Sequence, residues 1–516
     1  MSVRELRSFL SGEWRSGAGP EQILRDATSG GPVACFRSGG HDIGAALAWG
    51  RTRGGPALRR LTFRARGELV ASLATALRDV RPELLEIART YGATAADARR
   101  DVDGGLFTLA YYGRLGAKAL PEAGFLLDGA VEPLSRKGGF AGRHILVPRH
   151  GIAVQINAYN FPCWGPLEKL GPALLAGVPS LVKPATRAAL LTCHLVEAIV
   201  ESGILPNGSI SLLVGSGADL LDHLESQDAV LFTGSAETGR AIRSHPRVVA
   251  EAVRVNVEAD SLNASVLGPD AAPGTPVRAA FLREIRSEMS AKAGQKCTAI
   301  RRALVPESEV DSIAAEVRGV VEELRVGAPS DPETDVGPLV DPDAVRAARD
   351  GLTELLAEAD VIAGDPDAPL PAGAFFPPLA LRLRDGGAAA RVNSVEVFGP
   401  LVTLMPYRSA DEAAAICAAG GGSLVTSVFS NDAAFLAEVT TAIAPWNGRV
   451  MTVSGRALAE HSGHGVAVPQ LLHGGPGRAG GGEELGGLRA LHPFLNRCAV
   501  QGDPETLREL FPDGAA

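Results

Sequence analysis

Apolar and polar positions alternate with different periods along the chain, and these periods divide it into a helical first part and a mixed second part. Between about residues 41 and 120, apolar residues recur every three or four positions with charges between them, most clearly over 66–80 and 81–91. That spacing predicts amphipathic helices that cover a sheet. From residue 143 onward, short apolar runs alternate with further helical stretches.

The second part contains repeated strand-then-helix units. The predicted strand segments are 143–156 (strand, turn, strand), 180–183, 210–214 and 229–232, and the predicted helices are 188–201, 218–223 and 235–243. Such β-α-β units predict a parallel, doubly wound sheet with a cofactor at the carboxyl ends of its strands. A second α/β region is expected from strand 263–267 to about residue 455. The loop 364–378, rich in Pro, Gly and Asp, is expected to be a surface connection.

Length, charge and cysteine usage restrict the class of protein. A chain of 516 residues predicts two or more packed domains. The net charge of −9 argues against a nucleic acid or an anionic membrane as main partner. The N-terminus lacks an apolar signal region, and no apolar run reaches the ~18 residues of a membrane span, so a cytoplasmic protein is expected. The six Cys show no CxxC spacing, which indicates reduced thiols without a zinc site or disulfides.

Two residues carry the candidate chemistry. Cys297 lies in the run 294–298, and Glu258 ends the apolar stretch 253–258. A thiol nucleophile and a carboxylate base are what covalent oxidation of an aldehyde requires. Each residue also has a plainer interpretation, because a single Cys is usually a small buried hydrophobe and an acidic strand end is usually solvated. Backbone N–H groups after the thiol are expected to lower its pKa, while Lys296 either assists electrostatically or is solvent-exposed.

Six motifs in a fixed order strengthen this interpretation. They are 157–162 (NAYNFP), 183–185 (KPA), 232–235 (FTGS), Glu258, 294–298 (GQKCT) and 396–400 (EVFGP). Together they resemble the aldehyde dehydrogenase superfamily over roughly residues 5 to 500. The segment 473–487 resembles the branch that acts on CoA-linked semialdehydes in aerobic aromatic-ring degradation. Because the chain stops at residue 516, it resembles the stand-alone form of that branch rather than the form fused to a hydratase-like domain.

The resemblance implies an α/β architecture of three parts. A Rossmann-like cofactor-binding domain would comprise residues 1–125 and 146–262, and an α/β catalytic domain residues 263–479. A small β oligomerisation element would comprise residues 126–145 and 480–516, with a frayed end from 512 to 516. Because this element would expose strand edges, a homodimer or a dimer of dimers is expected.

The resemblance also assigns catalytic roles. Cys297 would attack the aldehyde to form a thiohemiacetal, and Glu258 would activate the water that hydrolyses the resulting thioester. The Asn160 side-chain amide, together with the Cys297 backbone N–H, would stabilise the oxyanion. The alternative for Asn160 is an Asx-turn before the Phe-Pro pair that follows it.

Eight residues are expected to bind a nicotinamide cofactor. They are Lys183, Thr186, Arg187, Gly234, Ser235, Gly239, Glu396 and Phe398. Lys183 would reach the ribose or phosphate, the 234–239 turn would face the pyrophosphate, Glu396 would bind ribose hydroxyls, and Phe398 would pack near the nicotinamide. NAD-preferring relatives commonly carry Glu where this chain has Thr186, followed here by Arg187, so NADP is expected to be preferred and NAD to remain possible. If Thr186 only caps the next helix and Arg187 faces solvent, dual specificity follows.

The leading function that the resemblance implies is oxidation of a CoA-thioester semialdehyde. The expected substrate is 3,4-didehydroadipyl-CoA semialdehyde or a close relative. A CoA-acylating or acyl-phosphate-reducing relative is the enzymatic alternative, although such relatives commonly lack the base at Glu258. A catalytically retired binding protein on the same fold is the alternative of another class. The Gly-rich run 474–482 is either a tunnel rim or CoA contact with Arg478 as phosphate ligand, or a loop that lets the tail cross to a partner.

No metal site is expected. His461, His464 and His473 are the residues that suggest one. Their spacing through Gly-rich chain does not place them on one helix face, which disfavours a shared metal ion.

Overall fold

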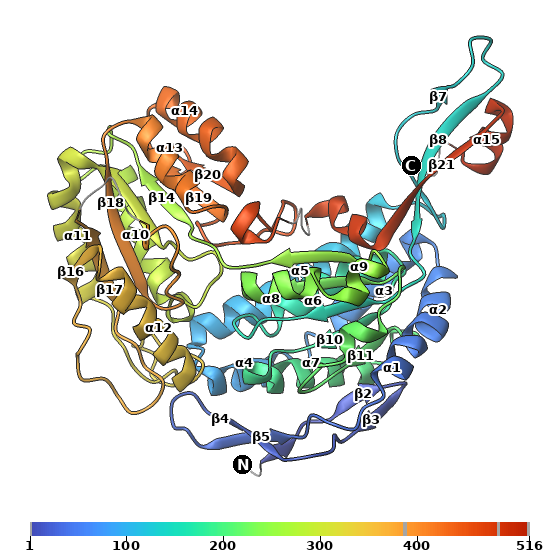
Figure 1. The fold of residues 1–516 in the computed structure, drawn as a ribbon, viewed down its shortest axis with the longest axis horizontal. Coiled ribbons are helices and arrows are strands. Elements are labelled where there is room, and N and C mark those ends of the chain that lie inside the picture. Colours follow the sequence, from blue (N-terminus) through green and yellow to red (C-terminus); the bar gives the residue numbers. More distant parts are fainter. Residues whose placement is uncertain (1–2, 385–389, 482–485, 513–516) are drawn as a thin grey trace.

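The computed structural model describes residues 3–384, 390–481 and 486–512, and two seven-stranded sheets organise it (Figure 1). The first sheet has the order β13-β12-β9-β10-β11-β2-β3. Its strands are β13 (Arg254–Glu258), β12 (Ala229–Thr233), β9 (Ala153–Ile156), β10 (Ser180–Lys183), β11 (Ile210–Leu212), β2 (Ser8–Leu10) and β3 (Glu13–Arg15). The first five strands are parallel, which confirms the predicted doubly wound core, whereas β2 and β3 add an antiparallel edge that the sequence did not predict.

Helices cover both faces of the first sheet because each presents one apolar stripe to it. They are α1 (Ile43–Trp49), α2 (Gly55–Arg59), α3 (Phe63–Ala76), α4 (Arg81–Ala88), α5 (Ala95–Ala119), α6 (Trp164–Leu175), α7 (Ala189–Glu201), α8 (Ala236–Arg243) and α9 (Pro246–Ala250). The longest, α5, begins with a capping box in which Thr94 and Asp97 satisfy each other's backbone N–H groups. The predicted helix over 218–223 is wrong, because only a 3₁₀ turn, η4 (Leu220–His223), forms there.

The second sheet has the order β16-β17-β18-β15-β14-β19-β20. Its strands are β16 (Ala359–Ala363), β17 (Leu379–Leu383), β18 (Leu401–Tyr407), β15 (Arg302–Pro306), β14 (Ala264–Leu267), β19 (Ser423–Phe429) and β20 (Asn447–Val453). The helices around it are α10 (Pro276–Ser290), α11 (Val310–Glu322), α12 (Pro342–Leu355), α13 (Ala410–Ala419) and α14 (Ala433–Ile443). The central strands β14 and β19 are buried along their whole length, as expected for a parallel sheet covered on both faces.

The loop predicted as a surface connection, 364–378, is only partly exposed. Its second half carries Ala374, Phe375 and Phe376, which are all at most 3% exposed. Ala374 exchanges backbone hydrogen bonds with Ala27 and Leu339, so this half packs against the N-terminal segment. Composition indicated a loop correctly but gave no sign of its burial.

A separate four-stranded sheet forms an arm that extends away from the body (Figure 1). It contains β21 (Leu495–Gly502), β8 (Ala141–Pro148), β6 (Leu126–Leu127) and β7 (Glu132–Pro133), with α15 (Pro504–Leu510) packed beside it. The two segments predicted for oligomerisation therefore lie together. β8 crosses the predicted boundary at 145/146, and residues 513–516 of the predicted frayed end lie outside the described residues.

The arm is tied to the first sheet through Arg254, the first residue of β13. Its Nη1 donates to the carbonyl oxygens of His492 at 2.8 Å and Leu495 at 2.5 Å. A smaller three-stranded sheet, β1 (Arg4–Glu5), β5 (Pro32–Phe36) and β4 (Gln22–Arg25), covers the opposite side and was not predicted. Within the described residues, no helix combines the length and the apolar character that crossing a membrane requires.

Candidate active site

Parallel strands of the first sheet end at one edge, and the candidate residues gather there. Glu258 is the last residue of β13, Thr233 the last of β12, and Asn160 lies on the loop that follows β9. The carboxyl edge of a doubly wound sheet is where ligands bind. Cys297 comes to this edge from the loop that follows α10, so the site lies between the two sheets.

Close backbone packing fixes the loop before Cys297. Gly294 has a φ of +70°, and a Cβ there would lie 2.1 Å from the carbonyl oxygen of Gly399, so only glycine fits. Lys292 and Ala293 also adopt left-handed conformations, each with a φ of 51°. Such residues cost free energy and persist where the surrounding structure over-determines them, often at active sites.

Buried contacts over-determine Lys292. Its Nζ donates to the Asn160 carbonyl oxygen and lies 3.9 Å from Asp101 Oδ2, and its backbone N–H donates to Asp97 Oδ1 at 2.8 Å. The ammonium also lies 4.5 Å from the ring centroid of Phe161. Burial lowers the pKa of Lys292, and it raises the pKa of Asp101 although Lys292 opposes that shift. This network joins α5, the Asn160 loop and the Cys297 loop.

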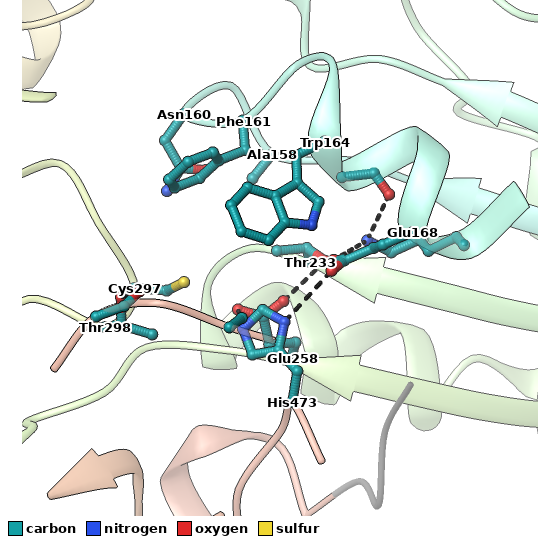
Figure 2. A pocket seen from close by; sticks show the side chains of 14 residues that line it. Ala158, Asn160, Phe161, Trp164, Glu168, Thr233, Glu258, Cys297, Thr298 and His473 are labelled. Atoms are coloured by element: carbon teal, nitrogen blue, oxygen red, sulfur yellow. Dashed lines mark hydrogen bonds and ion pairs between the residues drawn. The ribbon is translucent and has the colours of Figure 1, made fainter. Parts of the chain in front are cut away.

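Cys297 lies in a small pocket together with its candidate base (Figure 2). The pocket is lined by Ala158, Asn160, Phe161, Trp164, Gly165, Glu168, Lys169, Thr233, Glu258, Cys297, Thr298, Gly465, Ala467 and His473. Burial raises the pKa of Cys297 well above its usual value, and the nearby charge of Glu258 raises it further. The expected lowering of this pKa by the backbone N–H groups that follow is wrong, because burial and the carboxylate raise the pKa instead.

Lys296 is neither solvent-exposed nor close enough to offset this effect. Its ammonium forms a buried ion pair with Glu288, at 2.8 Å and 2.9 Å from the two carboxylate oxygens. Its charge lowers the pKa of Cys297, but only as a minor contribution. Burial and the Glu258 charge therefore dominate the shift in the pKa of Cys297.

Two hydrogen-bond donors that were predicted to bind an oxyanion belong to residues of this pocket, Asn160 and Cys297, and their role stays a prediction. The Asn160 side-chain Nδ2 donates to the Gln295 carbonyl oxygen at 3.1 Å, which fixes the amide and leaves its second N–H. Within the described residues, no group accepts a hydrogen bond from the Cys297 backbone N–H. The Asn160 side chain makes no Asx-turn contact with the residues after it, so the alternative interpretation of this residue finds no support.

Glu258 is held loosely. Its Oε2 accepts a 3.4 Å hydrogen bond from Thr233 Oγ1, and its Oε1 lies 3.7 Å from His473 Nε2. One ligand atom from each of Glu258, Cys297 and His473 lies within 4.8 Å of the others. All three belong to the thiol pocket, and the expected absence of a metal stays a prediction.

The sequence reasoning missed three charged residues of this pocket. His473 bridges towards Glu168, with Nδ1 3.4 Å from Oε2, and Glu168 Oε1 lies 3.5 Å from Lys169 Nζ. An adjacent Glu-Lys pair inside the otherwise apolar helix α6 was the signal that could have identified them. His473 was considered only with His461 and His464, which face Glu284 and Ser427 instead.

A longer cleft of about 560 Å³ opens from the thiol along the strand ends. Of the predicted cofactor residues, Gly234, Ser235, Glu396 and Phe398 line it, and Arg478 does so too. Burial raises the pKa of Glu396, although Arg301, 3.2 Å away, opposes the shift. The Phe398 ring contacts the Tyr159 ring edge-on, with centroids 6.1 Å apart. The cleft thus combines the thiol with a pair of aromatic rings and a carboxylate.

The predicted pyrophosphate turn forms at that far end. Ser235 caps α8 by accepting from the Thr238 backbone N–H at 3.2 Å. Gly239 allows α8 to pack on β13, because a Cβ there would lie 2.7 Å from Val257 Cγ1. Asp260 Oδ1 accepts from the first helical N–H, that of Ala236, at 2.9 Å. A glycine-bearing turn that opens a helix beside an elongated cleft fits a dinucleotide.

The remaining three predicted cofactor residues do not line the cleft. Lys183 ends β10 with its side chain beside Gly217, and burial lowers its pKa. Thr186 begins the 3₁₀ turn η3 (Thr186–Ala188) and caps no helix with its side chain. Arg187 is not free in solvent: its guanidinium forms a 3.0 Å ion pair with Asp341 and lies 5.7 Å from the Tyr159 ring centroid.

Fold, thiol pocket and dinucleotide cleft together define an aldehyde-oxidising enzyme, and residues 33–452 match the aldehyde dehydrogenase family. The chain belongs to this family and is an NAD(P)-dependent oxidoreductase. It is 46% identical over 479 residues to the 3,4-dehydroadipyl-CoA semialdehyde dehydrogenase of Aromatoleum evansii. The matched region covers 92% of this chain and 93% of that protein. It is 27% identical over 494 residues to the 3-sulfolactaldehyde dehydrogenase of Priestia aryabhattai, and this match covers 93% of this chain and 95% of that protein.

The solved structures confirm the predicted fold class. Betaine aldehyde dehydrogenase from Staphylococcus aureus in complex with NAD⁺ superposes with a TM-score of 0.83 at 23% identity, covering 96% of this chain and 95% of that one. At this identity the likeness shows the fold alone. The predicted aldehyde dehydrogenase architecture is therefore correct.

Proposed function

We propose that the enzyme oxidises a CoA-linked semialdehyde, with 3,4-didehydroadipyl-CoA semialdehyde as substrate, to the corresponding acid. The observation that carries the chemistry is the shared pocket of Cys297 and Glu258, which holds a nucleophile and a base within 4.8 Å. The substrate class rests on the relative that is 46% identical over 92% of this chain.

The chain's own residues divide the work. Glu258 takes the thiol proton of Cys297, whose sulfur attacks the aldehyde carbon and forms a thiohemiacetal. Asn160 and the Cys297 backbone N–H donate to the oxyanion. After oxidation to the thioester, Glu258 releases the thiol proton to solvent and then takes a proton from water. The water oxygen bonds to the carbonyl carbon, and the bond to Cys297 breaks so that the sulfur leaves as a thiolate. The nicotinamide cofactor, when bound along the cleft, supplies the acceptor for the hydride.

The presence of Glu258 disfavours the two rivals. A CoA-acylating or acyl-phosphate-reducing enzyme needs no base for water, yet this pocket contains a buried carboxylate beside the thiol. A retired binding protein needs neither residue. Cys297→Ala should abolish aldehyde oxidation and leave cofactor binding nearly unchanged, since the cleft residues remain. Appreciable turnover of that variant would overturn the proposal, and Cys35→Ala, at a half-buried thiol on β5, is the matched control.

The substrate class is tested by comparing CoA-linked and free semialdehydes of the same chain length. The proposal expects kcat/KM to be at least about tenfold higher for the CoA thioester, because the nucleotide part adds binding energy far from the reacting carbon. Equal values for both would remove CoA recognition from the proposal while leaving aldehyde oxidation intact.

For the cofactor we propose a preference for NADP. Thr186 provides a hydroxyl where a carboxylate would repel a 2′-phosphate, and Lys183 ends the neighbouring strand as a cation. The ion pair of Arg187 with Asp341 and Asp343 weakens its own contribution. The test is kcat/KM for both cofactors in the parent and in Thr186→Glu, which should shift preference towards NAD. Equal or better use of NAD by the parent contradicts the preference.

We also propose that the enzyme works in the cytoplasm as a homodimer or a dimer of dimers. The support for assembly is the arm, where β21 is an edge strand and Leu134 and Phe140 are 50% and 43% exposed. Unpaired strand edges beside exposed apolar side chains are typical of interfaces between subunits.

A further inference from the structure

His473 lies between two carboxylates at the wall of the thiol pocket (Figure 2). Its Nδ1 is 3.4 Å from Glu168 Oε2, and its Nε2 is 3.7 Å from Glu258 Oε1. The His473, Glu168 and Glu258 side chains are only 12%, 10% and 7% exposed. Neutral imidazole has one donor, so only the imidazolium can donate towards both carboxylates.

The charges around His473 favour that imidazolium. Burial lowers the pKa of His473, but Glu258 and Glu168 outweigh burial and raise it above its usual value. Arg449, from β20, opposes this shift. Lys169 faces the far side of Glu168 and helps to lower the pKa of that carboxyl despite its burial. The pocket wall is thus a row of alternating charges that ends at the catalytic base.

Glu258 has few other partners. Its Oε2 accepts a long 3.4 Å hydrogen bond from Thr233, and the Cys297 thiol is its neighbour in the pocket. Neither Glu258 Oε1 nor His473 Nε2 has a hydrogen-bond partner in the described structure, and the two atoms face each other at 3.7 Å. Because the His473 and Glu258 side chains are only 12% and 7% exposed, solvent screens the ionic attraction across this distance weakly.

We propose that His473 is a positioning residue for thioester hydrolysis: its imidazolium, anchored by Glu168, holds the Glu258 carboxylate where it takes a proton from the attacking water. The inference rests on the proposed function. His473 neither gains nor loses a proton in this step. The proton goes from water to Glu258, the water oxygen bonds to the acyl carbon, and the Cys297 sulfur leaves.

The test separates the first turnover from hydrolysis in His473→Gln, which loses the charge, and His473→Phe, which keeps a ring. Stopped-flow measurement should show the first equivalent of reduced cofactor forming within about threefold of the parent rate. Acyl-enzyme hydrolysis should slow at least ~10-fold, because small misplacement of a base costs this much or more. Mass spectrometry of quenched enzyme should show an acyl adduct on Cys297. His461→Gln, at a histidine 3.6 Å from Glu284, is the matched control and should keep both rates.

A pH profile distinguishes positioning from mere packing. In the parent, hydrolysis of the acyl-enzyme should fall as pH rises through the raised pKa of His473, because the imidazolium is lost. In His473→Gln this alkaline decline should be absent. Glu168→Gln should move the decline to lower pH, since one of the carboxylates that raise this pKa is removed.

Two results would overturn the inference. One is parent-like hydrolysis in both His473 variants, which would leave His473 as a wall residue. The other is an equal loss in both phases together with a lower melting temperature, which indicates a structural role. A parent whose first turnover does not depend on Cys297 would instead overturn the proposed function, so the two failures are distinct.

Discussion

At the scale of single residues, Glu258 has opposite effects on Cys297 in the resting and the reacting enzyme. Its charge, added to burial, raises the pKa of the thiol and keeps the sulfur protonated. The same carboxylate has an oxygen within 4.8 Å of the sulfur and is the acceptor that we propose for the thiol proton. Protection of the thiol and its activation therefore depend on one side chain.

Replacing Glu258 by Gln should separate the two half-reactions. The amide keeps the volume and loses basicity, so a rapid burst of reduced cofactor should be followed by turnover about 100-fold slower than that of the parent. Stopped-flow absorbance measures both phases. Glu201→Gln, at the exposed end of α7, serves as control. Turnover of Glu258→Gln at the parent rate would show that Glu258 is not the base, and would favour the CoA-acylating alternative.

The pKa of Cys297 has its own consequence for reactivity. The thiol is mostly protonated at neutral pH, so alkylation by iodoacetamide should be slow at pH 7 and accelerate as pH rises towards the raised pKa. Glu258→Gln should move this acceleration to lower pH, because it removes a charge that raises the pKa. An unchanged alkylation profile in that variant would show that burial alone sets the thiol's ionisation.

The sequence predicted individual site residues best where a single residue performs one chemical role. Cys297, Glu258 and Asn160 lie in one pocket, as the motifs indicated. His473 was not recognised, because its role depends on a carboxylate 305 residues away in the sequence. Charge pairs between distant segments leave no periodic signal.

At the scale of elements, the turn before Cys297 depends on a helix far from it in sequence. Lys292 joins α5, through Asp97 and Asp101, to the loop that carries Asn160. Two consecutive left-handed residues would not form this turn on local preference alone. The sequence predicted the helix α5 region but not this contact, because buried ion pairs are fixed by tertiary packing.

Lys292→Met should therefore damage stability and catalysis together. It leaves the Asp101 carboxylate buried without its cation, which costs ~3–5 kcal/mol. The melting temperature should fall by about 3–5 °C, and kcat should fall because the Asn160 loop loses an anchor. Differential scanning calorimetry and steady-state rates measure these effects.

A double variant tests the cause. Lys292→Met combined with Asp101→Asn should recover part of the lost melting temperature, since the uncompensated charge is gone. Lys118→Met, near the end of α5, is the control for the loss of a lysine. Additive losses in the double variant would show that the two residues do not act as a pair.

At the scale of the whole molecule, the arm is the feature that a single chain leaves incomplete. Within the described part of the chain, its outer strand β21 pairs only with β8. Four consecutive residues of β21, from Asn496 to Ala499, are exposed. An unpaired edge of this length invites another strand. We therefore expect sedimentation to give at least twice the 53.4 kDa mass of one chain.

Charge placed on the arm should weaken this assembly. Leu134→Asp combined with Phe140→Asp should lower the sedimentation coefficient at micromolar concentration, because each introduces a charge into an apolar interface. Ile23→Asp, at a 47% exposed position on the opposite side of the molecule, is the control. A stable monomer of the parent at micromolar concentration would contradict the expected dimer.

The sequence predicted the large architecture better than its edges. The parallel core of the first sheet was predicted correctly, because apolar strand runs and amphipathic helices that are long enough carry a clear periodic signal. The strands β2, β3 and the sheet of β1, β4 and β5 were missed, since segments of two to five residues carry too little pattern. The buried half of the loop 364–378 escaped for a related reason: its Pro and Gly residues indicate a turn whether or not the turn is covered.

The position of Arg254 has one more consequence. This residue holds the tail of the arm, and Glu258 follows it four positions later on the same strand. A strand is stiff along its length, so a shift at its first residue is transmitted to its last with little loss. Substitutions in the arm can therefore displace Glu258. Changes that improve contacts between subunits have to leave the register of β13 unchanged.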